Sequence, residues 1–270
     1  TAPKLIGTMN HPGIFRDIAI NGNNLYITTV DDGLLVINIT FPDNPILLGQ
    51  LPLPSAMSLA VKDDRAYVAS TGNGVHIIDI STPSTPRVIS QANLPWPFQQ
   101  FAKFHQMSVA EDAIYMAAGE GELIIYDISD ENHPKLAEIA HIDGEALAVA
   151  VKEGKVYVAT RQGRLWIMER DNNKLSLRGL ADILGNCRAI KFKDDKIVLA
   201  NGEKGLTIIS EPQQLTVRQA DATSRVRTPA LATIDIPPQA QPAVYNLALF
   251  QDGKVQEFFG AVRVTERQEN

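Results

Sequence analysis

Short apolar segments alternate with polar turns along most of the chain, and the alternation repeats at intervals of roughly 40 residues. In each repeat an apolar segment ends in a Gly, Asp or Asn turn, as in 57–64, and a second segment with a tyrosine follows at once, as in 66–70. A turn that contains glycine then leads into a continuous apolar run such as 75–80. These segments lack helical periodicity, so the pattern predicts short antiparallel strands, the third of which is covered on both faces.

The third segment of a repeat ends in a recurring polar sequence. It reads "GLLVINITFPDNP" at 33–45, "GVHIIDISTPSTP" at 74–86 and "GELIIYDISDENHP" at 121–134. An Asp or Asn before a hydroxyl residue favours an Asx-type turn, and the prolines that follow prevent further strand pairing. A fourth apolar segment comes next, as in 87–92 and 215–220. The proline loop is therefore predicted to connect the third and fourth strands.

Five such units predict an all-β fold, a β-propeller of four-stranded antiparallel blades. A four-stranded sheet cannot cover both of its own faces, so neighbouring sheets must stack around an axis. A β-sandwich is the structural rival, but sandwiches rarely show this internal similarity. Residues 4–9 match the fourth-strand pattern and residues 245–267 offer three more strands. We therefore expect a sixth blade, built from both termini, that closes the ring and removes exposed strand edges.

The C-terminal part leaves an alternative open. In the favoured interpretation, repeats cover 1–220, a Pro/Ala/Gln-rich insertion or linker covers 221–244, and closing strands cover 245–270. The sixth unit is a poor copy, however, because it has no tyrosine in the second strand and no aspartate after the third. Residues 225–270 also resemble the second half of an immunoglobulin-like domain of bacterial surface proteins. The alternative is thus five blades followed by part of an immunoglobulin-like sandwich.

Charge and composition exclude several classes of protein. The net charge of −6 argues against nucleic acid as the partner, since phosphate binding needs clustered positive charge. The one cysteine, Cys187, allows no intrachain disulfide and no cysteine-based metal site. No apolar run reaches the roughly 18 residues that would span a bilayer, so membrane insertion is not expected. The start in "TAPKLIG" suggests a mature or excised piece of a larger multidomain chain.

The repeated units resemble the LVIVD repeat of bacterial and archaeal proteins. The resemblance rests on the three proline-loop sequences quoted above, on the "Y-[IVM]-[TA]" strand before each of them, and on "HPGIFRDIAINGNNLYIT" at 11–28. It covers roughly 4–220, although the fourth and fifth units lack the Asp-Ile-Ser-Pro ending. The likeness implies a β-propeller that is secreted or displayed at the cell surface, often within a large multidomain protein. It implies no catalytic residue and no cofactor.

One insertion distinguishes the second crossover between units. The segment "NLPWPFQQFAKF" at 93–104 carries Trp96, Phe98, Phe101 and Phe104. Strand directions place it on the face that holds the blade-to-blade crossovers. Its aromatic side chains either fold back as a small additional core over the channel or form an exposed surface for a partner.

Basic residues at the starts of the innermost strands form the second candidate site. Arg16, His105 and Arg188 would make a weakly electropositive funnel able to hold a carboxylate or phosphate. In the alternative interpretation these side chains pair with nearby carboxylates. The carboxylates in reach by sequence are Asp17, Asp143 and Asp182.

Histidines on the same face do not predict a metal site. His11, His105 and His141 could bind zinc only if they converged, but they belong to different crossovers and to inequivalent repeat positions. We therefore expect no metal.

These features favour a non-catalytic binding module, extracellular or at the cell surface, that presents crossover loops to a protein or glycan. An alternative is a six-bladed hydrolase or lactonase with a central calcium ion, which needs several oxygen ligands. The strand mouths offer only Asp17, Gln106 and Asn246 for that purpose, so no enzyme activity is predicted. A further alternative is a structural spacer in a large adhesin-like protein.

Overall fold

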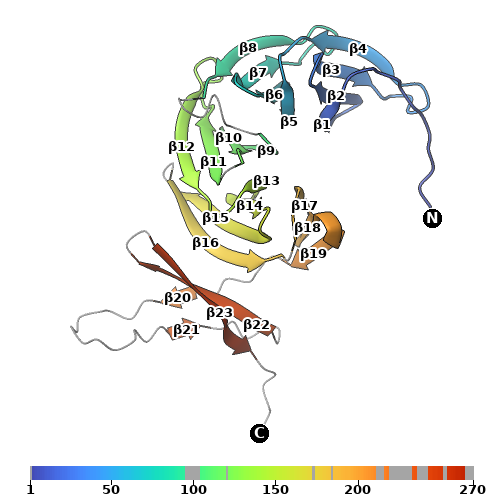
Figure 1. Ribbon diagram of the computed structural model, residues 1–270. Helices are drawn as coiled ribbons and strands as arrows, with labels where there is room; N and C mark the ends of the chain where they lie inside the picture. Colours follow the sequence, from blue (N-terminus) through green and yellow to red (C-terminus); the bar gives the residue numbers. More distant parts are fainter. Residues whose placement is uncertain are drawn as a thin grey trace.

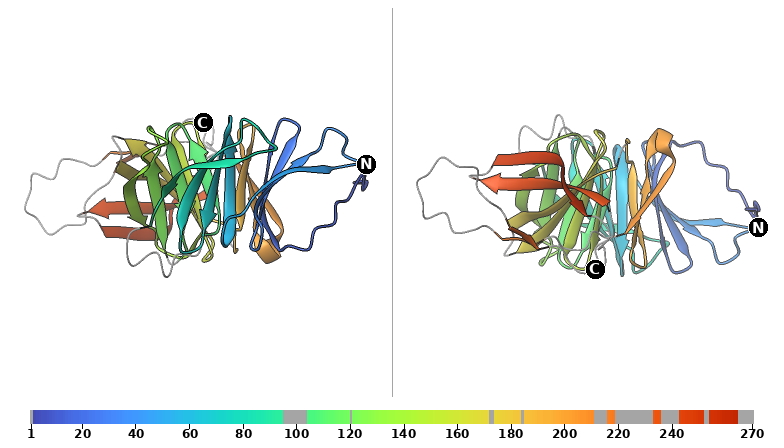
Figure 2. Two further views of the ribbon diagram at one scale, coloured as in Figure 1. Left: turned by 90° about the horizontal axis from the view of Figure 1, so that it is seen from above. Right: turned by 90° about the horizontal axis from the view of Figure 1, so that it is seen from below.

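The protein is described by a computed structural model that covers residues 2–94, 104–119, 121–171, 174–183, 185–210, 216–218, 233–235, 243–251 and 254–264. Five small sheets follow one another around a common axis and form an open arc (Figure 1). Seen from the side, the arc is a disc (Figure 2). The propeller prediction is confirmed, and the blade number is the five of the alternative interpretation.

The first four blades are antiparallel meanders of four strands each. Blade 1 contains β1 (Phe15–Asn21), β2 (Asn24–Thr29), β3 (Gly33–Asn38) and β4 (Ile46–Leu51). Blade 2 contains β5 (Ala56–Lys62), β6 (Arg65–Ser70), β7 (Gly74–Asp79) and β8 (Arg87–Ala92). Blade 3 contains β9 (Met107–Ala110), β10 (Ala113–Ala117), β11 (Glu122–Asp127) and β12 (Lys135–His141). Blade 4 contains β13 (Ala146–Lys152), β14 (Lys155–Thr160), β15 (Arg164–Asp171) and β16 (Lys174–Asp182).

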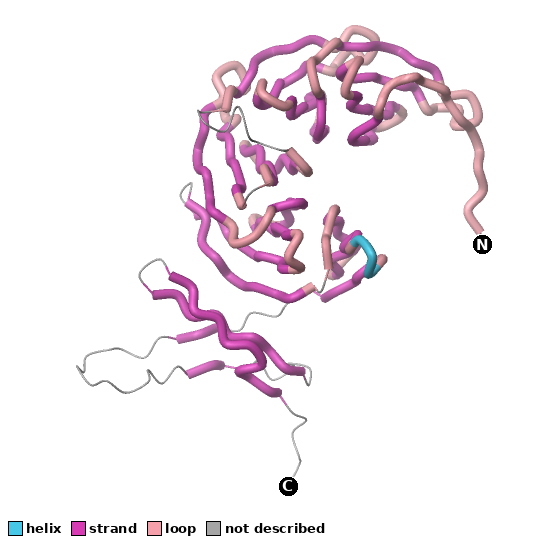
Figure 3. The backbone as a smooth tube through the Cα atoms, in the orientation of Figure 1, coloured by secondary structure: helices cyan, strands magenta, loops and turns pink. Residues whose placement is uncertain are grey.

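Blade 5 has three strands among the described residues, β17 (Ala189–Lys193), β18 (Lys196–Ala200) and β19 (Leu206–Ser210). A single 3-10 turn (Gly202–Lys204) joins the last two and is the only helical element in the described parts of the chain (Figure 3). The fourth strand expected at 215–220 does not join this blade. Instead β20 (Thr216–Arg218) pairs with β21 (Thr233–Asp235) in a separate sheet.

The cores lie between the blades, because alternate residues of each strand face opposite neighbours. The second-strand tyrosines are at most 5% exposed, and each packs in the cluster shared with the following blade. These residues are Tyr26, Tyr67, Tyr115 and Tyr157. The next residue along the strand faces the preceding blade, as Val68 does in the core between blades 1 and 2. The continuous apolar runs of the sequence are thus explained by burial on both sides.

The polar ending of the third strand forms the expected Asx turn. The Oδ1 atoms of Asn38, Asp79 and Asp127 accept hydrogen bonds of 2.9–3.0 Å from the backbone N–H two residues later. In blade 2 the Arg87 guanidinium also donates to Asp79, at 2.8 Å from Nη2. The hydrogen bonds from Ser81 and then Arg87 hold the pKa of Asp79 well below its usual range.

Replacement of Asp79 by asparagine removes the charge at this turn and keeps the turn itself, since Asn38 forms the same turn in blade 1. A lowered folded-state pKa stabilises the fold above the ordinary carboxyl pKa, and this contribution is lost as the pH falls below that value. We expect Asp79→Asn to lower the urea midpoint at about pH 6 and the difference from wild type to shrink at about pH 3. Asp31→Asn, at an exposed turn, is the control; a difference that is constant with pH would contradict the assignment.

The sixth blade expected from the two termini is not formed, and that prediction was wrong. Residues 4–9 are not in a strand and pair with none of the described strands; Met9 instead packs against Ile27, Leu35 and Ile37 of blade 1. The C-terminal strands β22 (Ala243–Gln251) and β23 (Lys254–Val264) pair with each other as a separate hairpin. β22 lies beside β16, at the outer edge of blade 4 (Figure 1). Each of these two strands therefore forms backbone hydrogen bonds with the other, and the hairpin does not need the N-terminal segment.

Among the described residues, no helix has the length and apolar character needed to cross a bilayer.

Candidate functional site

The inserted loop of the crossover face is fixed at both of its ends. Leu94 is 2% exposed and Phe104 is 3% exposed, and both belong to the core between blades 2 and 3. Tyr126 Oη donates a 2.9 Å hydrogen bond to the carbonyl oxygen of Asn93, the first residue of the loop. Burial raises the pKa of Tyr126 to about 12, so the phenol remains a donor. The two ends of the loop are therefore part of the rigid body of the propeller.

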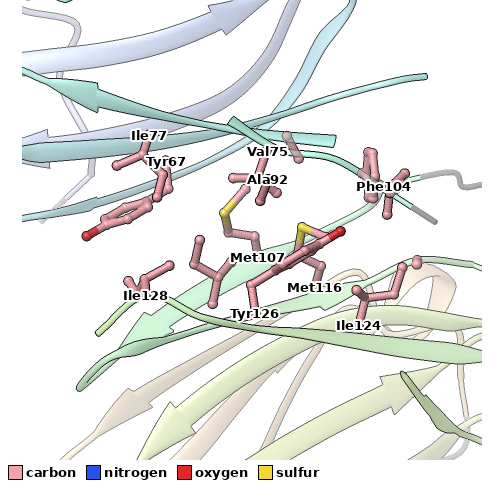
Figure 4. Packing of buried hydrophobic residues seen from close by; sticks show 14 residues of the cluster. Tyr67, Val75, Ile77, Ala92, Phe104, Met107, Met116, Ile124, Tyr126 and Ile128 are labelled. Atoms are coloured by element: carbon pink, nitrogen blue, oxygen red, sulfur yellow. The ribbon is translucent and has the colours of Figure 1, made fainter. Parts of the chain in front are cut away.

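Phe104 lies among Val75, Ala92, Met116 and Ile124 in this core (Figure 4). One of the four aromatic residues of the insertion is thus a packing residue between two blades. The other three, Trp96, Phe98 and Phe101, lie outside the described residues. For them the contact surface stays a prediction.

The predicted basic funnel contains an ion-pair cluster that the sequence did not reveal. Glu145, just before β13, accepts hydrogen bonds from Nε and Nη2 of Arg161, the latter at 2.9 Å. His105 Nε2 lies 3.7 Å from Glu145 Oε1. The carboxylate of Glu145 raises the pKa of Arg161. His105 therefore faces an acid, as in the alternative interpretation, although that acid is Glu145.

The two arginines of the funnel differ from His105 in exposure. Arg16 on β1 and Arg188 before β17 are exposed, whereas His105 is partly buried. Arg16 lies in the inner strand of the first blade, and His105 and Arg188 lie just before the inner strands of the third and fifth blades. They are thus spread around the axis.

Asp17, the one carboxylate expected at the strand mouths, connects blades 1 and 2. Its Oδ2 accepts hydrogen bonds from Ser58 Oγ at 3.1 Å and from the Leu59 backbone N–H at 2.9 Å. Gln106 Oε1 is buried without a hydrogen-bond partner among the described residues. Within the described ranges, no three His, Cys, Asp or Glu side chains are close enough to hold a metal ion.

A cavity of about 570 Å³ opens between blades 2 and 3 on the opposite face. Glu131 of the third proline loop lies in it and accepts from Arg65 Nε at 2.6 Å and from Tyr67 Oη at 2.9 Å. Burial and the hydrogen bond to Glu131 raise the pKa of Tyr67. Both carboxylate oxygens are thus used to connect the blades. Sequence reasoning missed this contact. Its single signal was Glu131, an acid at the position where the first two proline loops have Pro42 and Pro83.

The repeat pattern identifies the family. The model of the LVIVD repeat matches residues 12–51, 55–93, 104–141 and 143–169, together more than half of the chain. The chain belongs to the LVIVD repeat family. The matches cover blades 1–3 and reach into β15 of blade 4 of this LVIVD-repeat protein. They do not extend to 225–270, so the immunoglobulin-like interpretation of that segment finds no support there.

Solved structures share the fold at low sequence identity. BamB from Moraxella catarrhalis is similar over 72% of this chain and 56% of its own, with 11% identity and a TM-score of 0.52. The β-propeller domain of Myceliophteria thermophila Cps50 (Swd1) is similar over 86% of this chain and 73% of its own, with 12% identity and a TM-score of 0.61. The LVIVD-repeat chain thus spans little more than half of BamB. No curated protein matches the sequence.

Proposed function

We propose that this LVIVD-repeat propeller is a non-catalytic binding module whose crossover face contacts a protein or a glycan. The observation that carries the proposal is the anchoring of the inserted loop, with Leu94 and Phe104 both buried in one interblade core. Binding residues are often carried by loops that a rigid scaffold positions, and the buried ends fix where this loop leaves and rejoins the propeller. The middle of this loop contains three aromatic residues, the residue type most enriched in binding hot spots.

The polar residues beside the loop suit the rim of such a surface. Glu145 and Arg161 form an ion pair, with His105 beside it, next to the end of the insertion. Paired charges around an aromatic centre are typical of interface rims, where they contribute more to specificity than to affinity. We further propose that the module acts outside the cell, at a surface, within a larger chain, as the family likeness implies.

The test removes the loop aromatics together. The triple variant Trp96→Ser, Phe98→Ser, Phe101→Ser should lose at least about tenfold in affinity for ligands found on a glycan array or a displayed peptide library. Its thermal midpoint should stay near that of wild type, because Phe104 keeps the loop end in the core. The measurements are titration by interferometry and a thermal melt.

A matched control is Val88→Ser with Leu136→Ser, two exposed apolar residues on the outer strands β8 and β12. This control should bind as wild type does. Unchanged binding by the loop variant, or equal loss in the control, would refute the proposal. Clear calcium binding in calorimetry would instead favour the hydrolase alternative.

A further inference from the structure

At each end of the propeller arc, one blade face has no neighbouring blade among the described residues. In Figure 1 the inner strands of blade 1 and blade 5 border an open sector between β1 and β17. The fractional exposure of equivalent residues shows whether these faces are ordinary surfaces. Equivalent residues of a repeat have equivalent surroundings, so the exposure of a residue in an end blade can be compared with that of the same position in the other blades.

Blade 5 exposes the residues that every other blade buries against its successor. Leu206 is 65% exposed and Ile208 is 58% exposed. The equivalent third-strand residues of blades 1–4 are at most 5% exposed. Those residues are Leu34, Val36, Val75, Ile77, Leu123, Ile125, Leu165 and Ile167. Val198, paired with Ile208, takes the place of the buried tyrosines.

Blade 1 exposes the complementary face. Ile18 is 61% exposed and Ile20 is 66% exposed. The residues equivalent to Ile18 in blades 2–5 are at most 5% exposed, and they pack against the preceding blade. They are Leu59, Met107, Val149 and Ile190. Met9 covers Ile27, Leu35 and Ile37 but leaves the two β1 isoleucines open.

A polar contact between blades is also left incomplete. In blades 1, 2 and 4 the last residue of the first strand donates to a turn carbonyl of the next blade, whereas blade 3 has Ala110 at this position. Asn21 Nδ2 donates to Asp63 O at 2.7 Å, Lys62 Nζ to Glu111 O, and Lys152 Nζ to Asp194 O at 2.7 Å. Lys193 occupies this position in blade 5, where its side chain is 80% exposed and lies 3.9 Å from the neighbouring carboxylate of Asp194. The repeat thus provides a donor where a following blade would place its first turn.

We propose that the open sector accepts a further four-stranded blade of the same repeat type, carried by a partner chain. Such a blade would bury Leu206 and Ile208 on one side and Ile18 and Ile20 on the other. Its first turn would accept a hydrogen bond from Lys193. The residues that line this sector are not those of the insertion, so the inference does not depend on the function proposed above.

Charge favours a partner over a second copy of this chain. Lys191, paired in register with Val198, is exposed on the same face as Ile208 and Lys193. A second copy would place the isoleucines of its β1 opposite these lysines, without a carboxylate on that strand face. Its five blades would also have to continue around an axis that the first copy already surrounds (Figure 1). A partner blade with two apolar faces and acidic groups opposite Lys191 and Lys193 fits both requirements.

The experiment uses blade 2 of this chain, residues 55–93, as the donor blade. The donor is joined to the N-terminus of the full chain through a Gly/Ser linker of about 30 residues, which gives a millimolar effective concentration. The full chain carries Ile208→Cys, and the rate of thiol labelling reports the exposure of the face. Cys187 is buried and its pKa is raised to about 11, so it contributes little labelling.

We expect the tethered donor to slow labelling of Ile208→Cys at least about tenfold, which corresponds to an occupied fraction above nine-tenths. Labelling of Leu136→Cys, an exposed control on β12, should not change. A donor with Leu59→Glu, the residue that packs on the preceding blade, should lose the protection, whereas a donor with the exposed Val88→Glu should keep it. Lys193→Ala in the chain should weaken protection.

Two results would overturn the proposal. Equal labelling with and without the tethered donor would show that no blade of this type occupies the sector. Protection of Ile208→Cys in the untethered chain that rises with its own concentration would make a second copy the occupant. In either case the binding tests on Trp96, Phe98 and Phe101 are unaffected, because those variants leave both end faces unchanged.

Discussion

Replacing Gly74 by alanine is expected to destabilise the propeller by at least about 3 kcal/mol. Gly74 has φ +76, a left-handed conformation that costs an L-residue about 1–2 kcal/mol. A Cβ atom there would also lie 2.0 Å from the carbonyl oxygen of Ala92, which is backbone at the end of β8 and cannot turn aside. The loss should appear as a lower midpoint in urea unfolding, with the slope unchanged.

Gly154→Ala separates the two causes. Gly154 has nearly the same φ, +74, but no atom lies within 4 Å of its added Cβ. The free energy of unfolding of this variant should therefore fall only by the conformational cost, about 1–2 kcal/mol. Equal destabilisation by the two substitutions would show that close approach of β8 to β7 does not matter.

The same approach explains why glycine recurs at the start of the third strand of the repeat. At Gly33 an added Cβ would lie 2.3 Å from the Leu51 carbonyl oxygen, and at Gly121 it would lie 2.7 Å from that of Ile142. In both places the chain leaves the fourth strand beside the start of the third. The glycine therefore marks where the meander ends and the crossover to the next blade begins.

Phe104→Ala should lower the free energy of unfolding by about 3–5 kcal/mol. The side chain is 3% exposed and packs in the core between blades 2 and 3, where truncation leaves a cavity that the two sheets cannot close. Because the residue also anchors the inserted loop, loop-dependent binding should fall in the same variant. Urea unfolding followed by Trp fluorescence or circular dichroism measures the first effect.

Phe41→Ala is the control, since Phe41 is 68% exposed in the first proline loop. It should change the free energy of unfolding by less than about 0.5 kcal/mol. If Phe104→Ala were as mild as Phe41→Ala, the anchoring of the loop would be wrong, and with it the basis for the binding surface. The variant of the three loop aromatics should resemble the control in stability and Phe104→Ala in binding.

The candidate site was only partly predictable from the sequence. The insertion at 93–104 and the position of His105 follow from comparison between repeats. The pairing of His105 with Glu145, and of Glu131 with Arg65 and Tyr67, joins residues far apart in the chain or in different blades. Such contacts depend on the angle between neighbouring sheets, and the hydrophobic pattern of the sequence does not predict that angle.

The sequence by itself determined the strands of the first four blades and the inner three of the fifth, their order within a blade and the faces they bury, because hydrophobic alternation and turn residues act locally. It also determined the Asx turn that Asp79 and Asp127 form, since that turn needs only adjacent residues. The tertiary structure decided how many blades assemble and what the termini do. Met9 packs on blade 1, β22 pairs with β23, and the faces around Ile18 and Ile208 stay open. The local sequence of each repeat specifies a blade that packs against blades of the same kind. The number of blades that pack together depends on the tertiary structure as a whole.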